Sequence, residues 1–313
     1  MALRSNRRGF LQAALGAGAG LTLSQLAARP ALSHVLPSPI LANHLNDHLV
    51  VLTGAGANSV ALRGSDGASA LLVDGGLSER SKDLIKAALR ETGTRRIQTV
   101  VNTHWHPEQT GSNERLGKEG ATIVAHENTR LWLGYEQEVP WENRTYGPLS
   151  PKARPNETLY DSEKTTFGGE QIDYGYLLQA HTDGDIYVFF RESNVLAAGG
   201  VVSGEGWPVI DWKTGGWIGG LVEGLKTLAK VTDSHTRIVP ANGPLLTHDD
   251  LVSQRDMYAT IFDRLQKLLR MGLSPDEVVA EHVTKEFDEK WGEPTQFVMM
   301  AFKSLWGHFA PDA

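Results

Sequence analysis

The chain has 313 residues, 41% of them hydrophobic, which is enough to bury a full core. Its formal charge is −7 at pH 7, and such an acidic body repels nucleic acid and anionic lipid, so we expect neither as a partner. The sequence has no cysteine, which excludes disulfides, thiolate metal ligands and a cysteine nucleophile. Any metal ion must be held by histidine, carboxylate or carbonyl groups.

Residues 1–33 are predicted to be a targeting segment that does not belong to the folded domain. They contain arginines but no acid, so their removal leaves a still more acidic body. Arg7 and Arg8 precede an Ala/Gly/Leu stretch, and small residues come just before His34. This pattern resembles a twin-arginine export signal, with an ordinary secretory signal or an uncleaved anchor as alternatives. The resemblance implies that the twin-arginine machinery delivers the protein to the periplasm or outside, without stable membrane insertion after cleavage.

In the remaining chain, residues 34–313, short apolar runs broken by Gly and Asp predict strands, and amphipathic runs predict helices. A strand, helix and strand in succession indicate layered α/β packing, and a second set follows in the same order. Between the two sets, residues 135–162 lack periodicity, so we interpret them as a long surface loop. The predicted strands are 49–52, 59–62, 70–73, 97–101, 171–178, 186–190, 195–198 and 236–239, and the helices are 78–92 and 221–231.

The C-terminal part, residues 251–313, is predicted to be helical. Residues 251–270 carry an apolar stripe, and residues 295–306 are strongly apolar. Ser274 and Pro275, followed by two acids, form a well-defined helix start. We expect these helices to pack on the domain, with an oligomer contact as the alternative; the oligomeric state itself stays open.

Three histidines are candidate metal ligands. His104 and His106 follow a predicted strand and are separated by one residue, so in an extended segment both project to one side. His181 follows another strand at a junction with a loop. For each alone, the alternative is an ordinary hydrogen-bonded histidine. Together, three imidazoles and a water form an open catalytic site for one Zn²⁺, although the same ligands accept other divalent ions.

Several segments resemble motifs of the metallo-β-lactamase superfamily. Residues 103–109 (THWHPEQ) are similar to its T-H-x-H-x-D-H motif. Residues 74–76, 180–185 and 239–244 are similar to further motifs, in the family's order, and residues 204–216 look like a segment of its lactamase-like members. The resemblance covers about residues 45–250. It implies an α/β fold, a four-layer αββα sandwich, with extra C-terminal helices at about 251–313.

The same resemblance indicates that the second metal site of the family is degenerate. Where the family has an Asp and a His in the first motif, a bridging Asp and a late His, this chain has Glu108, Gln109, Gly200 and Asn242. Amides are weak neutral ligands and glycine has no side chain, so only Glu108 remains as a charged candidate. One bound metal ion is therefore expected rather than a pair.

The function implied is an exported hydrolase in which one metal-activated water attacks a small cyclic or activated carbonyl compound, such as a lactam, lactone or ester. Phosphodiester cleavage relies on two metals about 3.5–4 Å apart, so it is disfavoured. Glu108 is interpreted as a general base, with a weak second ligand or a structural carboxylate as alternatives. Asp74 is interpreted as orienting a ligand histidine. The alternative functions are an inactive binding protein with a decayed metal site and a two-metal hydrolase rebuilt with oxygen ligands.

Aromatic residues concentrate near these motifs and in the predicted loop. They either wall an apolar substrate pocket or simply pack in the core. The residues concerned are Trp105, Trp132, Trp141, Trp207, Trp212, Trp217, Tyr135 and Tyr146.

Overall fold

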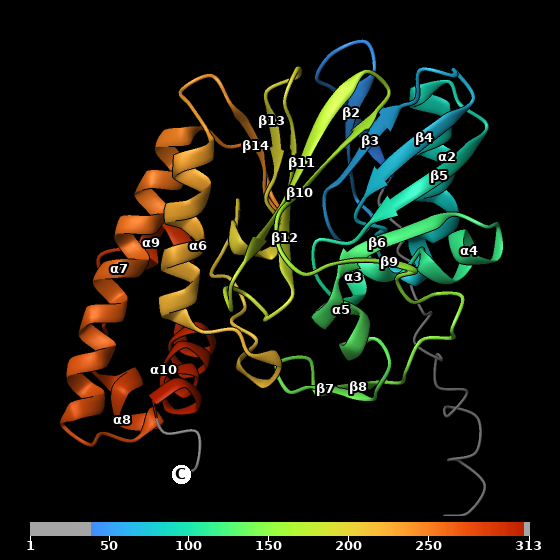
Figure 1. The fold of residues 1–313 in the computed structure, drawn as a ribbon. Helices are drawn as coiled ribbons and strands as arrows, with labels where there is room; N and C mark the ends of the chain where they lie inside the picture. The colour runs from blue at the N-terminus through green and yellow to red at the C-terminus, as the bar shows by residue number, and fades with distance from the viewer. Residues whose placement is uncertain (1–38, 310–313) are drawn as a thin grey trace, which may run out of the picture. The chain divides into compact units, whose positions relative to one another are not determined.

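Two β-sheets lie face to face in the computed structural model, which describes residues 39–309 (Figure 1). The first sheet has the spatial order β1-β2-β3-β4-β5-β6-β9, the second has the order β10-β11-β12-β13-β14, and β7 and β8 form a separate hairpin. The strands of the first sheet are β1 (Leu41–His44), β2 (Leu49–Thr53), β3 (Ser59–Arg63), β4 (Ser69–Val73), β5 (Arg96–Val101), β6 (Thr122–His126) and β9 (Glu157–Leu159). The other strands are β7 (Gln137–Val139), β8 (Arg144–Tyr146), β10 (Glu163–Phe167), β11 (Glu170–Leu177), β12 (Asp185–Phe190), β13 (Val195–Ala197) and β14 (Arg237–Val239).

Apolar side chains from both sheets fill the space between them. Val60 and Leu71 of the first sheet belong to one buried cluster with Ile186 and Val188 of the second. Strands β4 and β12 are buried along their whole length, as strands covered on both faces are. Because buried apolar surface stabilises by about 25 cal/mol per Å², this cluster holds the two sheets together.

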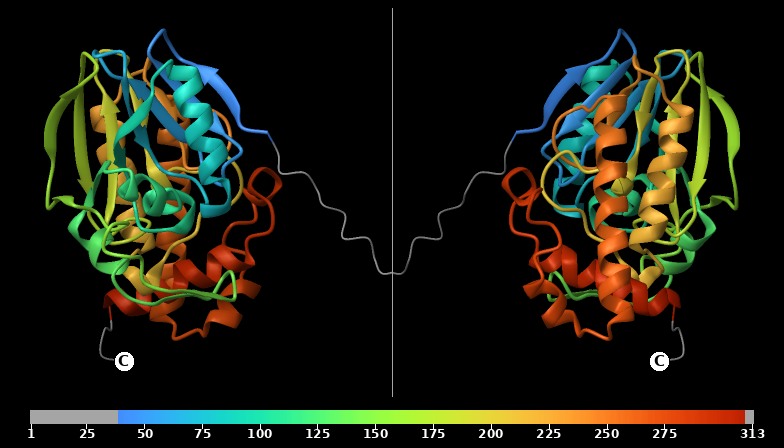
Figure 2. Two further views of the ribbon diagram at one scale, coloured as in Figure 1. Left: turned by 90° about the vertical axis from the view of Figure 1, so that its right-hand side faces the viewer. Right: turned by 90° about the vertical axis from the view of Figure 1, so that its left-hand side faces the viewer.

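Helices cover the outer face of each sheet (Figure 2). Leu84 and Ala88 of α2 pack against the first sheet, while Leu225 of α6 and Ile261 of α7 pack against the second. The four-layer αββα sandwich predicted from the sequence is thereby confirmed. The helices are η1 (Ser78–Arg80), α2 (Ser81–Thr92), α3 (Pro107–Thr110), α4 (Asn113–Lys118), α5 (Glu127–Trp132), η2 (Gly199–Val201), η3 (Trp212–Thr214), α6 (Ile218–Val231), α7 (His248–Arg270), α8 (Pro275–Ala280), α9 (Asp288–Trp291) and α10 (Thr295–Phe309).

The C-terminal helices belong to the same unit as the sheets. Helix α7 packs along α6, and α10 contacts α6, α7 and α8. The predicted helix start is present, since the Ser274 side chain accepts a hydrogen bond from the Glu277 backbone N–H in a full capping box. Among the described residues, no helix has the length and apolar character needed to cross a bilayer. The predicted export signal, residues 1–33, lies outside the part of the chain that the structure describes.

Every predicted strand and helix is present, but the interpretation of residues 135–162 as one surface loop is wrong. This stretch contains the β7–β8 hairpin and β9, which pairs in parallel with β6 and extends the first sheet. Each of these strands has only three residues, too few to produce a periodic pattern. The edge strands β1 and β10 also escaped prediction, because their exposed residues form no apolar run.

Candidate metal centre

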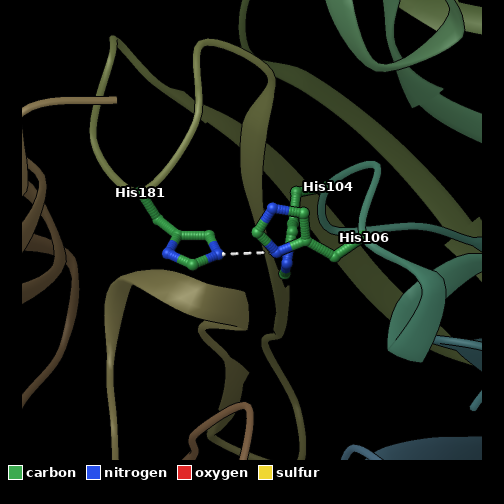
Figure 3. Close-up of side chains that lie close together, drawn as sticks. All are labelled: His104, His106 and His181. Carbon is green, nitrogen blue, oxygen red and sulfur yellow. Dashed lines mark hydrogen bonds between the residues drawn. The ribbon is translucent and has the colours of Figure 1, made fainter. Parts of the chain in front are cut away.

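The two sheets bring the three predicted histidines together. His104 and His106 lie in the segment that leaves β5, directly before α3, and His106 is the residue that precedes the first turn of that helix. His181 lies in the turn between β11 and β12 of the other sheet. The close-up in Figure 3 shows the rings converging on one point from these separate segments. The site therefore depends on the packing of one sheet against the other.

The three imidazoles form a compact, buried group. One nitrogen from each lies within 4.8 Å of the others, and His106 Nδ1 is 3.1 Å from His181 Nε2. The ring centroids are 4.7 to 4.8 Å apart, and the rings are nearly perpendicular. Burial lowers the pKa of His104 well below its usual value and that of His181 to about 3, with the neighbouring histidines adding to the effect. Both imidazoles are therefore neutral at pH 7, the form that binds metal.

The outward nitrogens of His106 and His181 both face oxygen acceptors. His181 Nδ1 donates to the Val209 carbonyl oxygen at 2.7 Å, and His106 Nε2 is 3.1 Å from Asp211 Oδ2. In a neutral imidazole only one nitrogen carries hydrogen, so these contacts leave lone pairs on His181 Nε2 and His106 Nδ1. Those are the two nitrogens that lie 3.1 Å apart, a contact that either a shared proton or a metal ion between them can stabilise. A zinc ion at about 2.0–2.1 Å from each nitrogen fits this spacing, and the three-nitrogen donor set suits it.

Asp211 is the functional residue that the sequence did not single out. Asp211 lies directly before η3 and is separated from His106 by 105 positions in the sequence. Its Oδ2 also accepts a hydrogen bond from Thr214 Oγ1 at 2.5 Å. Burial alone would raise the pKa of Asp211, but its contacts with His106 and Thr214 hold it below the usual value. The only local signal in the sequence is that Asp is a preferred N-cap residue, and the Asp211 side chain does accept a hydrogen bond from the Thr214 backbone N–H.

Asp74, which we predicted to orient a histidine, contacts Thr103, the residue before His104, and does not contact the imidazole ring. Its carboxylate accepts hydrogen bonds from the Thr103 backbone N–H at 2.8 Å and from Thr103 Oγ1. Thr103 Oγ1 in turn lies 3.1 Å from His104 Nδ1. Burial raises the pKa of Asp74 to about 7, with the hydrogen bonds from Thr103 opposing the shift. Asp74 therefore fixes the segment that carries His104 rather than the imidazole itself.

We expect Asp211→Asn to weaken zinc binding by about 10- to 100-fold, the usual cost of losing a carboxylate behind a ligand histidine. The amide keeps the size of the side chain but no longer carries the charge that holds the His106 tautomer. A competition titration against a chelating dye measures the affinity. Asp263→Asn, an exposed replacement on α7, is the matched control and should leave the affinity unchanged. Equal affinities for the two variants would contradict this role of Asp211.

The four degenerate positions do not form a second metal site in the structure. A Cβ on Gly200 would lie 2.3 Å from His181 Cδ2, so the ring of His181 occupies the space that a side chain there would need. Asn242 is engaged elsewhere, since its Oδ1 accepts from Ser203 Oγ at 3.0 Å and its Nδ2 donates to the Glu205 carbonyl oxygen. The three imidazoles are the only cluster of potential metal ligands found among residues 39–309.

A pocket of about 290 Å³ opens in front of the histidines. Glu108 and Gln109 line it, as do Trp141 and Trp207, but the other tryptophans named above do not. Trp105, for example, lies behind the site, where its Nε1 donates to Thr214 Oγ1 at 3.0 Å. The prediction of an aromatic-walled pocket therefore holds for two of these tryptophans.

Residues 52–282, which make up most of the described chain, match the family model described as the metallo-beta-lactamase superfamily. The chain belongs to this superfamily. Its fold and its histidine cluster thus fall within a family of metallo-hydrolases.

Individual relatives of this superfamily member are distant. A linear primary-alkylsulfatase from Pseudomonas sp. is 23% identical over 248 residues, covering 67% of this chain and 47% of that protein. The chain thus spans about half the length of this curated relative. Among solved structures, the sec-alkylsulfatase Pisa1 from Pseudomonas sp. superposes with a TM-score of 0.64 at 17% identity, covering 88% of this chain and 51% of that one. A metallo-beta-lactamase from Pontibacter korlensis gives a TM-score of 0.56 at 17% identity, covering 70% of this chain and 99% of that one. At such identities the structural matches support the fold alone.

Proposed function

We propose that the chain is a hydrolase that cleaves a small ester, lactone or lactam with one divalent metal ion, with zinc as the default. The observation that carries the proposal is the buried cluster of three imidazoles, in which His106 Nδ1 lies 3.1 Å from His181 Nε2 and His104 completes the set of ligands. Membership in the superfamily supports hydrolysis. The absence of room for a side chain at Gly200 supports a single metal ion.

The metal, when bound, would supply a Lewis acid that polarises a carbonyl oxygen and makes water acidic enough to attack near neutral pH. The chain's own contribution is to present three imidazoles close together, two of them oriented from behind by Asp211 and the Val209 carbonyl. Glu108 is half-buried in the pocket wall, two positions after His106. Its carboxylate has no hydrogen-bond or ion-pair partner in the described part of the chain, which suits a group that accepts a proton from the attacking water.

A second candidate is hydrolysis of an alkyl sulfate ester. The similarity to the sec-alkylsulfatase structure covers 88% of this chain, against 70% for the lactamase from Pontibacter korlensis. The curated relative is likewise an alkylsulfatase.

A substrate panel on purified protein separates these functions. We expect one zinc per chain by elemental analysis, zinc-dependent cleavage of p-nitrophenyl acetate, a γ-lactone or a chromogenic cephalosporin, and loss of both zinc and turnover in His181→Ala. Cleavage of alkyl sulfates alone would favour the second candidate. Bound zinc without turnover of any member of the panel would favour the non-catalytic binding protein, and two metals per chain would overturn the single-metal account.

We infer that the protein is exported in folded form, because Arg7 and Arg8 stand in a pattern that resembles a twin-arginine signal. Replacing both with lysine keeps the charge but removes the arginine pair that the export machinery recognises. The double variant should accumulate as uncleaved precursor in the cytoplasm, detected by immunoblotting of cell fractions. Normal export of this variant, with the single variant Arg4→Lys as control, would count against the inference.

A further inference from the structure

The pocket in front of the three histidines is lined by two carboxylates but by no lysine or arginine of the described residues. Glu108 and Glu142 both line it, and no lysine or arginine of residues 39–309 does. Arg144 follows Glu142 closely in the sequence but lines a neighbouring pocket, where its guanidinium carbon lies 4.7 Å from the centroid of the Tyr146 ring. A substrate that enters the site therefore meets carboxylates without a compensating cation on the protein.

The two carboxylates come from different segments of the chain, and both line the pocket. Glu108 lies in the first turn of α3 and has no partner in the described part of the chain. Glu142 lies between β7 and β8, next to Trp141, and accepts a hydrogen bond from Tyr146 Oη at 2.6 Å. Burial, the bond to Glu142 and the charge of Glu108 together raise the pKa of Tyr146 to about 12. Both carboxylates border the same pocket, although they come from different parts of the chain.

A third acceptor in the pocket is buried and unpaired. Gln109 is only 3% exposed and lines the pocket, and its Oε1 has no hydrogen-bond partner among the described residues. Buried polar atoms are nearly always satisfied, so this unpaired acceptor beside the pocket is open to a donor that a ligand brings. Together with the two carboxylates, Gln109 makes this wall a set of acceptors.

Two indole rings border the same space. Trp141 lies with its ring centroid 5.7 Å from that of His106. Trp207 is stacked on Phe297 at 4.6 Å, and its Nε1 donates to the Gly292 carbonyl oxygen at 3.0 Å, so its ring is fixed. The face of an indole attracts cations more strongly than that of any other side chain, and an adjacent carboxylate adds to the attraction.

We propose, on the basis of the hydrolase function above, that this pocket selects substrates that carry an ammonium group and rejects anionic ones. A bound divalent ion would bring two positive charges, which the carboxylates of Glu108 and Glu142 in the pocket wall offset. A sulfate or carboxylate group would thus find no net attraction in the pocket, whereas a substituted ammonium can be held by the indoles, the Glu142 carboxylate and, where it carries N–H, the Gln109 oxygen. The specificity of the chain would therefore differ from that implied by the names of its alkylsulfatase relatives.

Binding of a matched pair of probes tests this proposal without any turnover. Phenyltrimethylammonium and benzenesulfonate are similar in size and opposite in charge, and their dissociation constants are measured by quenching of tryptophan fluorescence, on zinc-loaded and on metal-free protein. We expect the ammonium compound to bind at least about tenfold more tightly than the sulfonate to both forms. Glu142→Gln should reduce this preference about fivefold or more.

The matched control is Glu136→Gln, which removes the same charge from an exposed side chain just before β7 that lines neither pocket. It should leave the preference intact, which separates a local effect from the general attraction of an acidic protein for cations. Tighter binding of benzenesulfonate, or an equal response to both variants, would overturn the proposal. Because metal-free protein is included, a failure of the hydrolase function would appear as absent zinc or absent turnover, while the binding preference would still be measurable.

Discussion

Replacing Gly200 with aspartate, the residue that the family uses to bridge two metals, is expected to abolish metal binding instead of restoring a second ion. A Cβ at this position would lie 2.3 Å from His181 Cδ2 and 2.6 Å from its Nε2. Carbon atoms do not approach so closely, so the His181 ring must move away and the three-nitrogen site loses one ligand. Elemental analysis should give well below one zinc per chain, and any zinc-dependent turnover should fall by at least about 100-fold.

The variant Gly200→Ala distinguishes the effect of the added carbon on zinc binding from the effect of the added negative charge. Alanine adds the colliding carbon without a carboxylate, so the alanine variant should lose zinc as completely as the aspartate variant. Gly147→Asp, at a position where no atom lies within 4 Å of an added Cβ, is the control for introducing an aspartate near the site and should keep its zinc. Two metal ions per chain in Gly200→Asp would refute the view that His181 fills the second site.

Much of the site could be predicted because its signals are local. His104 and His106 are separated by one residue after a strand, and alternation along an extended chain places both on one side. His181 follows a strand that was evident from its own apolar run. The missing bridging aspartate was also visible in the sequence, but the reason that it cannot simply be restored was not. The collision between position 200 and His181 exists only once the two segments are packed together.

The remaining features depend on contacts between distant parts of the chain. Asp211 reaches His106 across 105 positions, and nothing in its immediate neighbours identifies which histidine it would meet. Trp141 and Glu142 lie in a stretch that looked like an irregular loop, because strands of three residues have no detectable period. It is the β7–β8 hairpin that carries them to the pocket, and with them the acidic character of its wall.

Zinc is expected to stabilise the folded chain strongly. His106 Nδ1 and His181 Nε2 lie 3.1 Å apart in a buried site, and neither ring can turn away without giving up its bond to Asp211 or to the Val209 carbonyl, so the ligands are already positioned before the metal binds. A ligand that binds only the folded state stabilises it by about 4.1 kcal/mol at a free concentration of 1,000 times Kd. For a domain of this size that corresponds to an increase in Tm of roughly 8 to 15 °C, measured by calorimetry in a zinc buffer.

His181→Ala is the decisive comparison, because it removes one of the three ligand imidazoles. This variant should respond to zinc with little or no change in Tm, although the loss of a buried ring lowers its Tm in the absence of metal. Wild-type protein whose Tm does not rise in buffered zinc would identify the cluster as a decayed site that merely retains its histidines. A rise of equal size in both proteins would mean that zinc binds elsewhere on the chain. The single-metal account requires the stabilisation to be large and to depend on the imidazole of His181.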